Sequence, residues 1–291
     1  MDCSSENLDG TAGEPTGNIT IGNGPTLPRE ARLPINRCNL PAVILGSVTF
    51  QRHPTPLQLD GVHELHAELF AHLDQSAAPL ERIQLFREHL AAHFCLDHLD
   101  EAGLTEGCRA RAKANWMRIV RGWSFDADGR EGAVLKAWVE SRFGLLARFH
   151  REPLRDFDGP AYRCYQEMRA AGLYGTNALE SQLDLVYAFC QYEACRESLK
   201  RTHVTLFRGI NRIGDHEVLA RNGRKQVVLF NNLTSFSSSR ERAGEFGDYI
   251  LEAQVPIAKI FFHCRLLPGT LKGEDEYLVI GGAYEVEVRT T

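Results

Sequence analysis

The pattern of polar and apolar residues changes at residues 202–208, which read THVTLFR. Polar and apolar residues alternate there, and β-branched and aromatic side chains are frequent, as is typical of a half-buried strand. Segments of the same kind follow at 226–230, 249–255, 259–263, 277–280 and 284–288. Only one short helix, residues 240–246, is expected among them. The part of the chain after residue 200 therefore predicts a sheet.

Upstream of this point, apolar residues recur at spacings of three and four, which indicates amphipathic helices. The stripes are Val62, Leu65, Leu69 and Leu73; Ile83, Phe86, Leu90 and Phe94; Val134, Leu135, Trp138 and Val139; and Leu179, Leu183, Val186, Cys190 and Ala194. Gly144 predicts a helix end, and Asn177 with Glu180 resembles a capping box. The apolar run 40–45 predicts a short strand or a buried turn. Helices followed by strands predict an α+β fold.

Composition divides the chain into three parts. Residues 1–32 are rich in Gly, Pro, Asn, Ser and Thr, and we expect a mobile tail there. Residues 33–200 are expected to form a mainly helical lobe, and residues 201–291 a β-rich core. We expect the lobe and the core to fold as one continuous domain.

The overall composition excludes several classes of protein. The 291 residues are 43% apolar and 24% charged, close to the globular average, and no apolar run is long enough to span a bilayer. The 38 acidic side chains outnumber the 33 basic ones, which disfavours nucleic acid as a partner. The polar amino terminus indicates no secretory signal, and we expect a cytoplasmic protein with reduced cysteines.

Common metal and nucleotide motifs are missing from the sequence. No P-loop, H-E-x-x-H or G-x-S-x-G pattern occurs. His93, Cys95 and His98 cluster, but spacings of two and three do not bring all three to one helical face. We expect ordinary helix residues at these positions and no metal.

Three segments of the β-rich half carry polar groups suited to a site. In LFRG (206–209), a strand arginine either holds a phosphate or faces water. In LTSFSSS (233–239), the hydroxyls either cap the next helix and face solvent or orient a carboxylate. In GEDEYLVI (273–280), Glu274 and Glu276 share one face of an extended strand, where they either perform acid–base chemistry or form a charged loop.

The order of these segments resembles the Arg-Ser-Glu class of ADP-ribosyltransferases, over roughly residues 200–291. Longer stretches resemble the dinitrogenase reductase ADP-ribosyltransferases, namely LPINRCNLP (33–41), LFRGIN (206–211) and LPGTLKGEDE (267–276). The resemblance implies a helical N-terminal lobe followed by a mainly antiparallel β-sandwich core of ADP-ribosyltransferase type.

The resemblance also assigns the chemistry to two glutamates. It implies that NAD is the substrate, that its nicotinamide–ribose bond is cleaved, and that ADP-ribose passes to a protein side chain. Glu276 matches the catalytic residue, which holds the ribose 2′-hydroxyl and stabilises the developing oxocarbenium charge. Glu274 matches the residue that orients the acceptor, and a glutamate there resembles arginine-modifying members.

Further positions match the residues that bind the substrate NAD. Arg208 matches the arginine that grips NAD near its phosphates, and the Gly209 backbone is expected to bind the nicotinamide amide. Phe246 either stacks on nicotinamide or belongs to the core. The expected contacts to NAD are Arg208, Gly209, Ser235, Ser238 and Phe246.

One serine is expected to orient Glu276. The family pattern is Ser-Thr-Ser, and no window of residues 233–239 reproduces it. We assign Ser237 to this role, with Ser235 as the close alternative.

The resemblance implies two protein partners. The acceptor would be an arginine of dinitrogenase reductase, the nitrogenase iron protein, and its modification would switch nitrogen fixation off by blocking docking. A PII-type nitrogen-signalling protein would be the regulatory partner. Two alternatives stay open: an NAD glycohydrolase, and a non-catalytic module that binds NAD or a protein. Glu274 argues against the first, and Arg208 with Glu276 argues against the second.

Overall fold

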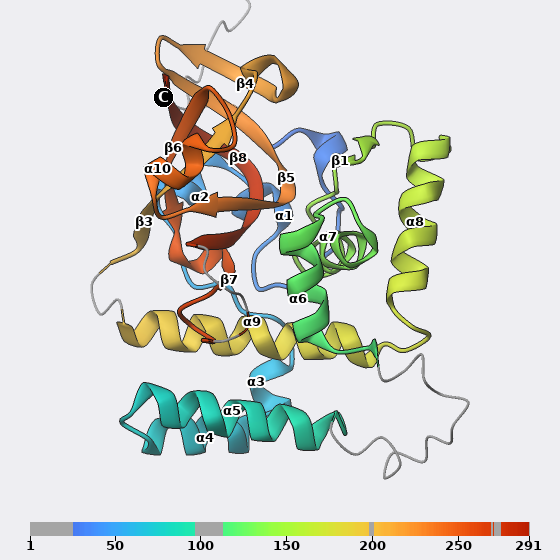
Figure 1. Cartoon of the computed structure of the whole chain (residues 1–291), viewed down its shortest axis with the longest axis vertical. Coiled ribbons are helices and arrows are strands. Elements are labelled where there is room, and N and C mark those ends of the chain that lie inside the picture. Colours follow the sequence, from blue (N-terminus) through green and yellow to red (C-terminus); the bar gives the residue numbers. More distant parts are fainter. Residues whose placement is uncertain (1–25, 97–112, 198–200, 269, 271–274, 291) are drawn as a thin grey trace, which may run out of the picture.

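The computed structural model describes residues 26–96, 113–197, 201–268, 270 and 275–290 (Figure 1). Its helices are η1 (Arg29–Ala31), α1 (Ala42–Leu45), α2 (Val48–Arg52), α3 (Val62–Leu65), α4 (Ala67–Gln75), α5 (Pro79–His93), α6 (Trp116–Phe125), α7 (Arg130–Phe143), α8 (Pro160–Gly172), α9 (Ala178–Glu197), η4 (Ile213–Asp215), α10 (Arg240–Gly244) and η5 (Ile257–Lys259). Within these residues, no helix is both long and apolar enough to cross a membrane. Most of the predicted tail, residues 1–25, lies outside the described part of the chain.

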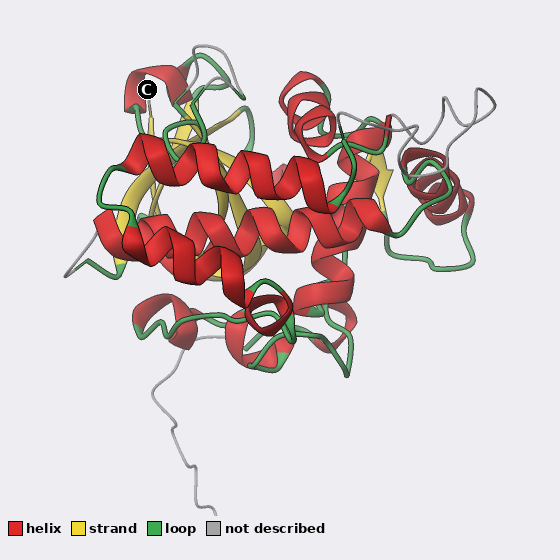
Figure 2. Cartoon of the chain, turned by 90° about the horizontal axis from the view of Figure 1, so that it is seen from below, coloured by secondary structure: helices red, strands yellow, loops and turns green. Residues whose placement is uncertain are grey.

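Helix α9 is the centre of the helical half. It runs across the sheet, with α4 and α5 on its other side (Figure 1, Figure 2). Its predicted apolar stripe, Leu179, Leu183, Val186, Cys190 and Ala194, is buried. Arg142 of α7 donates twice to Asp184 of α9, at 2.8 Å each, and Arg82 of α5 donates to both oxygens of Glu193, at 2.6 and 2.8 Å. Paired charges therefore join α9 to α7 and α5 where burial would penalise single ones.

The larger sheet has six antiparallel strands in the order β4-β5-β3-β6-β8-β7. These are β3 (His203–Ile210), β4 (Glu217–Asn222), β5 (Lys225–Ser237), β6 (Tyr249–Pro256), β7 (Ile260–His263) and β8 (Glu276–Thr290); the two-residue strands β1 (Phe149–His150) and β2 (Glu152–Pro153) form a separate pair. Strand β5 pairs with β8 along both of its halves and also contacts β3, so β3, β6, β8 and β5 close into a ring. The sheet is thus folded on itself, and β3 and β8 both lie beside the end of β5.

The sheet bends at an irregularity in β5. The pairing of β5 with β8 shifts register between residues 230 and 233. Buried Asn232 donates through Nδ2 to Lys136 O at 2.7 Å and to Leu145 O at 3.0 Å. These bonds attach the bend to α7, since the amide satisfies carbonyls that burial removes from water.

Gly281 of β8 lies opposite this bend. A Cβ atom built on Gly281 would be 1.8 Å from Asn231 O, a backbone atom that cannot move aside. The two strands therefore approach here more closely than any residue with a side chain permits. Lys259 Nζ donates to Gly281 O and lies 4.4 Å from the centre of the Tyr284 ring, and burial lowers the pKa of Lys259 to about 7.

Most of the predicted strands are confirmed, but the last two are joined. Segments 277–280 and 284–288 belong to one strand, β8. The hydroxyl cluster 233–239 is strand through Ser237, and Ser239 accepts a hydrogen bond from Arg242 N as the N-cap of α10. Strand β4 has no counterpart in the sequence prediction.

The helical half also departs from the prediction in places. Residues 40–45, expected as a strand or turn, contain helix α1, which starts after Pro41 and ends at Leu45, with Gly46 as its C-cap. The stripe from residue 62 to 73 spans two helices, α3 and α4, which are interrupted at His66. Glu180, expected to cap α9 with Asn177, instead pairs with Arg142 at 2.9 Å. Helices α6 and α8 were not predicted.

Substitution of Gly281 by alanine tests the close approach of β5 and β8. Because the added methyl group would overlap a backbone oxygen, we expect Gly281→Ala to lower the free energy of unfolding by roughly 2–3 kcal/mol. Gly214→Ala is the matched control, since a Cβ there meets no atom within 4 Å. Urea denaturation measures both. Equal stability of Gly281→Ala and Gly214→Ala would contradict the tight approach.

Candidate active site

A cavity of about 480 Å³ lies where β3, β5 and β8 meet α10 and the end of α6. Strand register brings the three strands together, since Phe207 of β3 lies opposite Ser237 of β5, and Ser237 lies opposite Glu276 of β8. The residues that line this cavity include Trp123, Ser124, Phe125, Arg208, Gly209, Ser235, Ser237, Phe246 and Glu276. Arginine, serine and glutamate segments from distant parts of the sequence therefore share one site.

The Glu276 carboxylate accepts a hydrogen bond at each of its two oxygens. Ser235 Oγ donates to Oε1 at 2.6 Å, and Ser124 Oγ donates to Oε2 at 2.6 Å. Trp123 Nε1 donates to Ser235 Oγ at 2.9 Å, which directs the serine proton toward the carboxylate. Short hydrogen bonds to a charged oxygen are about twice as strong as neutral ones. The carboxylate is thus fixed in orientation by one strand residue and two residues of α6.

Arg208 lies on the other side of Ser235. Its Nη1 donates to the Ser235 carbonyl oxygen at 2.7 Å, while its Nε is buried without a hydrogen-bond partner. Burial lowers the pKa of Arg208, and the nearby Glu276 charge opposes this effect. A buried guanidinium with an unpaired donor can bind an anionic ligand at low cost, because the guanidinium is already desolvated.

Gly209 sets the distance between β3 and α10. A Cβ atom at Gly209 would lie 1.8 Å from Ala243 O, a backbone atom of α10. The close approach at this glycine is therefore made by α10 of the same chain. Helix α10 leads to Phe246, which lines the cavity and is 68% exposed.

The predicted site residues fall into three groups. Arg208, Gly209, Phe246 and Glu276 all line the cavity. The contact predicted between Ser237 and Glu276 is made by Ser235 instead, and Ser237 Oγ accepts a bond from Ser239 N at 3.0 Å.

Two predicted residues remain, Ser238 and Glu274. Ser238 donates through its backbone N to Asp275 O at 3.1 Å, which ties the serine segment to the start of β8. Glu274 lies outside the described residues.

Sequence reasoning missed Trp123 and Ser124. Both lie at the end of α6, whose N-cap is Asn115; the Asn115 side chain accepts a bond from Met117 N at 2.9 Å. Asn115 is a typical N-cap signal and would have indicated the helix. No sequence pattern indicated that its last turn contacts Glu276.

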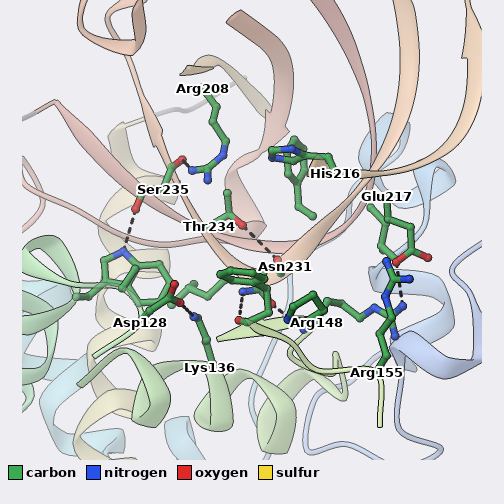
Figure 3. Close-up of a pocket in the computed structure, with 17 residues that line it drawn as sticks. Asp128, Lys136, Arg148, Arg155, Arg208, His216, Glu217, Asn231, Thr234 and Ser235 are labelled. Atoms are coloured by element: carbon green, nitrogen blue, oxygen red, sulfur yellow. Dashed lines mark hydrogen bonds and ion pairs between the residues drawn. The ribbon is translucent and has the colours of Figure 1, made fainter. Parts of the chain in front are cut away.

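A second cavity of about 390 Å³ adjoins the first (Figure 3). The two share Trp123, Ala127, Arg208 and Ser235. Its wall contains the bases Lys136, Arg148 and Arg155 and the acids Asp128 and Glu217. Lys136 donates to Asp128 at 2.6 Å and Arg148 to Glu217 at 2.9 Å, so both bases are held in place.

Comparison with known proteins connects this geometry to a family. The family described as "Dinitrogenase reductase ADP-ribosyltransferase (DRAT)" matches residues 35–288. A relative from Rhodospirillum rubrum, named NAD(+)--dinitrogen-reductase ADP-D-ribosyltransferase, is 40% identical over 257 residues, which cover 87% of this chain and 93% of the relative. No solved structure gives a significant match. This chain, in which arginine, serine and glutamate converge on one cavity, belongs to the dinitrogenase reductase ADP-ribosyltransferase family.

Proposed function

We propose that this chain transfers ADP-ribose from NAD to an arginine of dinitrogenase reductase. The observation that carries the proposal is the Glu276 carboxylate, which is held by two serine hydroxyls at the wall of a cavity that also contains Arg208. The family match and the printed name of the relative support NAD as the donor and dinitrogenase reductase as the acceptor. In this proposal the sheet is a core of ADP-ribosyltransferase type, and the helices before it are its N-terminal lobe.

The reaction needs a negative charge beside the ribose. When the bond from nicotinamide to ribose C1′ breaks, nicotinamide leaves with the electron pair and the sugar ring becomes positively charged. Glu276 stabilises this charge, and Ser235 and Ser124 fix the carboxylate before the substrate arrives. Preorganised charge of this kind requires little rearrangement in the transition state.

The acceptor arginine completes the transfer. A guanidinium nitrogen of the acceptor gives up one proton and uses the electron pair thus freed to form the new bond to C1′, so the product is a substituted guanidinium that still carries one positive charge. In our proposal Glu274 orients the acceptor and takes this proton. A glutamate in that role favours arginine over water as the acceptor, because the carboxylate attracts and aligns the guanidinium.

The two adjoining cavities, of about 390 and 480 Å³, together offer room for a dinucleotide. Arg208 lines both, so its guanidinium would bind the phosphates at their junction. The nicotinamide end would then lie near Gly209 and Phe246, and the adenosine end near Arg148. Ser235 would orient Glu276, in place of Ser237, and Ser238 would contact NAD through the same segment.

Two exposed aromatic side chains support a protein as the acceptor. Phe125 is 94% exposed and Phe246 is 68% exposed, and both line the cavity that contains Glu276. Exposed large apolar groups beside a site are typical of protein-binding surfaces. ADP-ribose on the docked arginine would add bulk and negative charge, which would block docking to the nitrogenase partner and switch nitrogen fixation off. A PII-type protein remains our proposed regulator.

Substitution of Glu276 tests the proposed chemistry. Purified dinitrogenase reductase and labelled NAD are incubated with each enzyme, and labelled arginine is identified in digests. We expect Glu276→Gln to lower transfer by on the order of 10²–10³ or more, because the amide cannot stabilise the cation. NAD binding, measured by calorimetry, should persist. Near-normal transfer by Glu276→Gln would exclude Glu276 from catalysis. If the wild-type protein released only free ADP-ribose, the glycohydrolase would be favoured. If the wild-type protein formed no product, the binding module would be favoured.

A pair of serine variants tests which hydroxyl orients Glu276. Ser235→Ala removes a hydrogen bond to a charged group, so we expect kcat to fall about 10- to 100-fold. Ser237→Ala is the matched control from the same strand and cavity, and we expect a change below about threefold. A larger loss from Ser237→Ala than from Ser235→Ala would reverse the assignment.

Glu274→Gln separates the acceptor role from NAD cleavage. We expect this variant to lose transfer to arginine and to retain some hydrolysis of NAD, because Glu276 still supports the cation. Chromatography of free ADP-ribose alongside the labelled protein measures both products. An equal loss of the two activities would show that Glu274 does not act on the acceptor alone.

A further inference from the structure

Three histidines that the proposed reaction does not use meet in the helical half. His66 lies at the junction of α3 and α4, where its backbone interrupts the helical pattern. His89 and His93 are four residues apart on α5, so their side chains lie on one face of that helix. Helix α5 lies beyond α9 from the sheet, whereas α10 of the proposed active site lies on the sheet itself (Figure 1).

The ring nitrogens have the separations of a metal-ligand set. One nitrogen from each ring lies within 4.8 Å of those from the other two, and His66 Nδ1 is 3.0 Å from His89 Nε2. In a tetrahedral zinc site with Zn–N bonds near 2.0–2.1 Å, ligand nitrogens lie about 3.3 Å apart. Small rotations of the rings would therefore bring all three onto one ion.

The protonation states also favour metal binding. Burial, with the neighbouring His93 and His89, lowers the pKa of His66 to about 4, and burial likewise lowers the pKa of His89. Neutral imidazole is the form that ligates a metal. Glu68 is close enough that its charge opposes the shift at His89, and the same charge would attract a cation.

The alternative without a metal ion is a hydrogen-bonded pair of histidines. In that case the bond between His66 and His89 holds two of the rings, and His93 contacts both of them only through its ring, as the neighbour of His89 one helical turn away. The metal site is favoured because a ring nitrogen of His93 also faces the other two. His93 is exposed, which leaves an access route and room for a water as fourth ligand. The cluster expected from sequence to be ordinary helix residues, His93 with Cys95 and His98, shares only His93 with this set, so the proposal departs from that expectation at His93. Cys95 Sγ points to Ala92 O at 3.8 Å, and His98 lies outside the described residues.

We propose that His66, His89 and His93 form a binding site for one divalent transition-metal ion, specifically Zn²⁺, with water as the fourth ligand. The ion would join the α3–α4 junction to α5. Helix α5 is itself attached to the rest of the molecule, because Arg82 pairs with Glu193 and Arg87 donates to Pro268 O. The site is thus a cross-link within the helical half, and it is independent of the proposed transfer reaction.

Metal titration of the full chain tests this site. Protein stripped with a chelator is titrated with ZnCl₂ by calorimetry, and Co²⁺ is used as a spectroscopic probe of tetrahedral nitrogen ligation. We expect one ion per chain, and a rise in Tm of about 5 °C at a hundredfold excess of free Zn²⁺ over Kd. Absence of one-to-one binding at micromolar Zn²⁺ would overturn the proposal.

Single variants locate the ion. His89→Ala and His93→Ala should each weaken Zn²⁺ binding at least about tenfold and so reduce the gain in Tm at the same Zn²⁺ concentration to about half or less, while circular dichroism confirms that they fold. His72→Ala is the matched control, because it is an exposed histidine of α4 outside the cluster. Wild-type affinity in either ligand variant, or an equal loss in His72→Ala, would show that the three rings do not hold the ion.

Discussion

The hydrogen bond from Ser235 to Glu276 is the contact on which the site depends. It joins β5 to β8 at the carboxylate, and it continues through Trp123 into the helical half. Both halves of the molecule must therefore be in place before the carboxylate has its orientation. Helix α6, which belongs to the helical half, supplies the donors Trp123 and Ser124.

The second constraint is the bend in the sheet, which is possible because residue 281 is a glycine. Because β5 and β8 approach so closely at Gly281, β8 can pair with one half of β5 before the bend and the other half after it. The end of β5 is thereby brought between β3 and the start of β8. Arg208, Ser235 and Glu276 occupy those three strands, so their convergence follows from the bend.

Local patterns predicted the elements better than the contacts between them. The stripe on α9 and the alternation in β3 are repeated signals, and both elements are present at those positions. Side-chain alternation places Ser235 and Ser237 on the same face of β5, so sequence alone cannot decide which one reaches Glu276. Trp123 and Ser124 precede Glu276 by about 150 residues in the chain, and His66 reaches His89 only through the packing of helices. Such long-range contacts depend on tertiary packing, which a period of two or 3.6 does not encode.

The contact of Gly209 with the Ala243 carbonyl oxygen has a mechanical consequence. One wall of the cavity is made of backbone pressed against backbone, so no change of side-chain rotamer can widen or narrow it. Any widening on that side requires α10 to shift as a rigid unit, and it would carry Phe246 with it. The spacing of β3 and α10 on that side is consequently set by main-chain geometry, which thermal motion of individual side chains leaves unchanged.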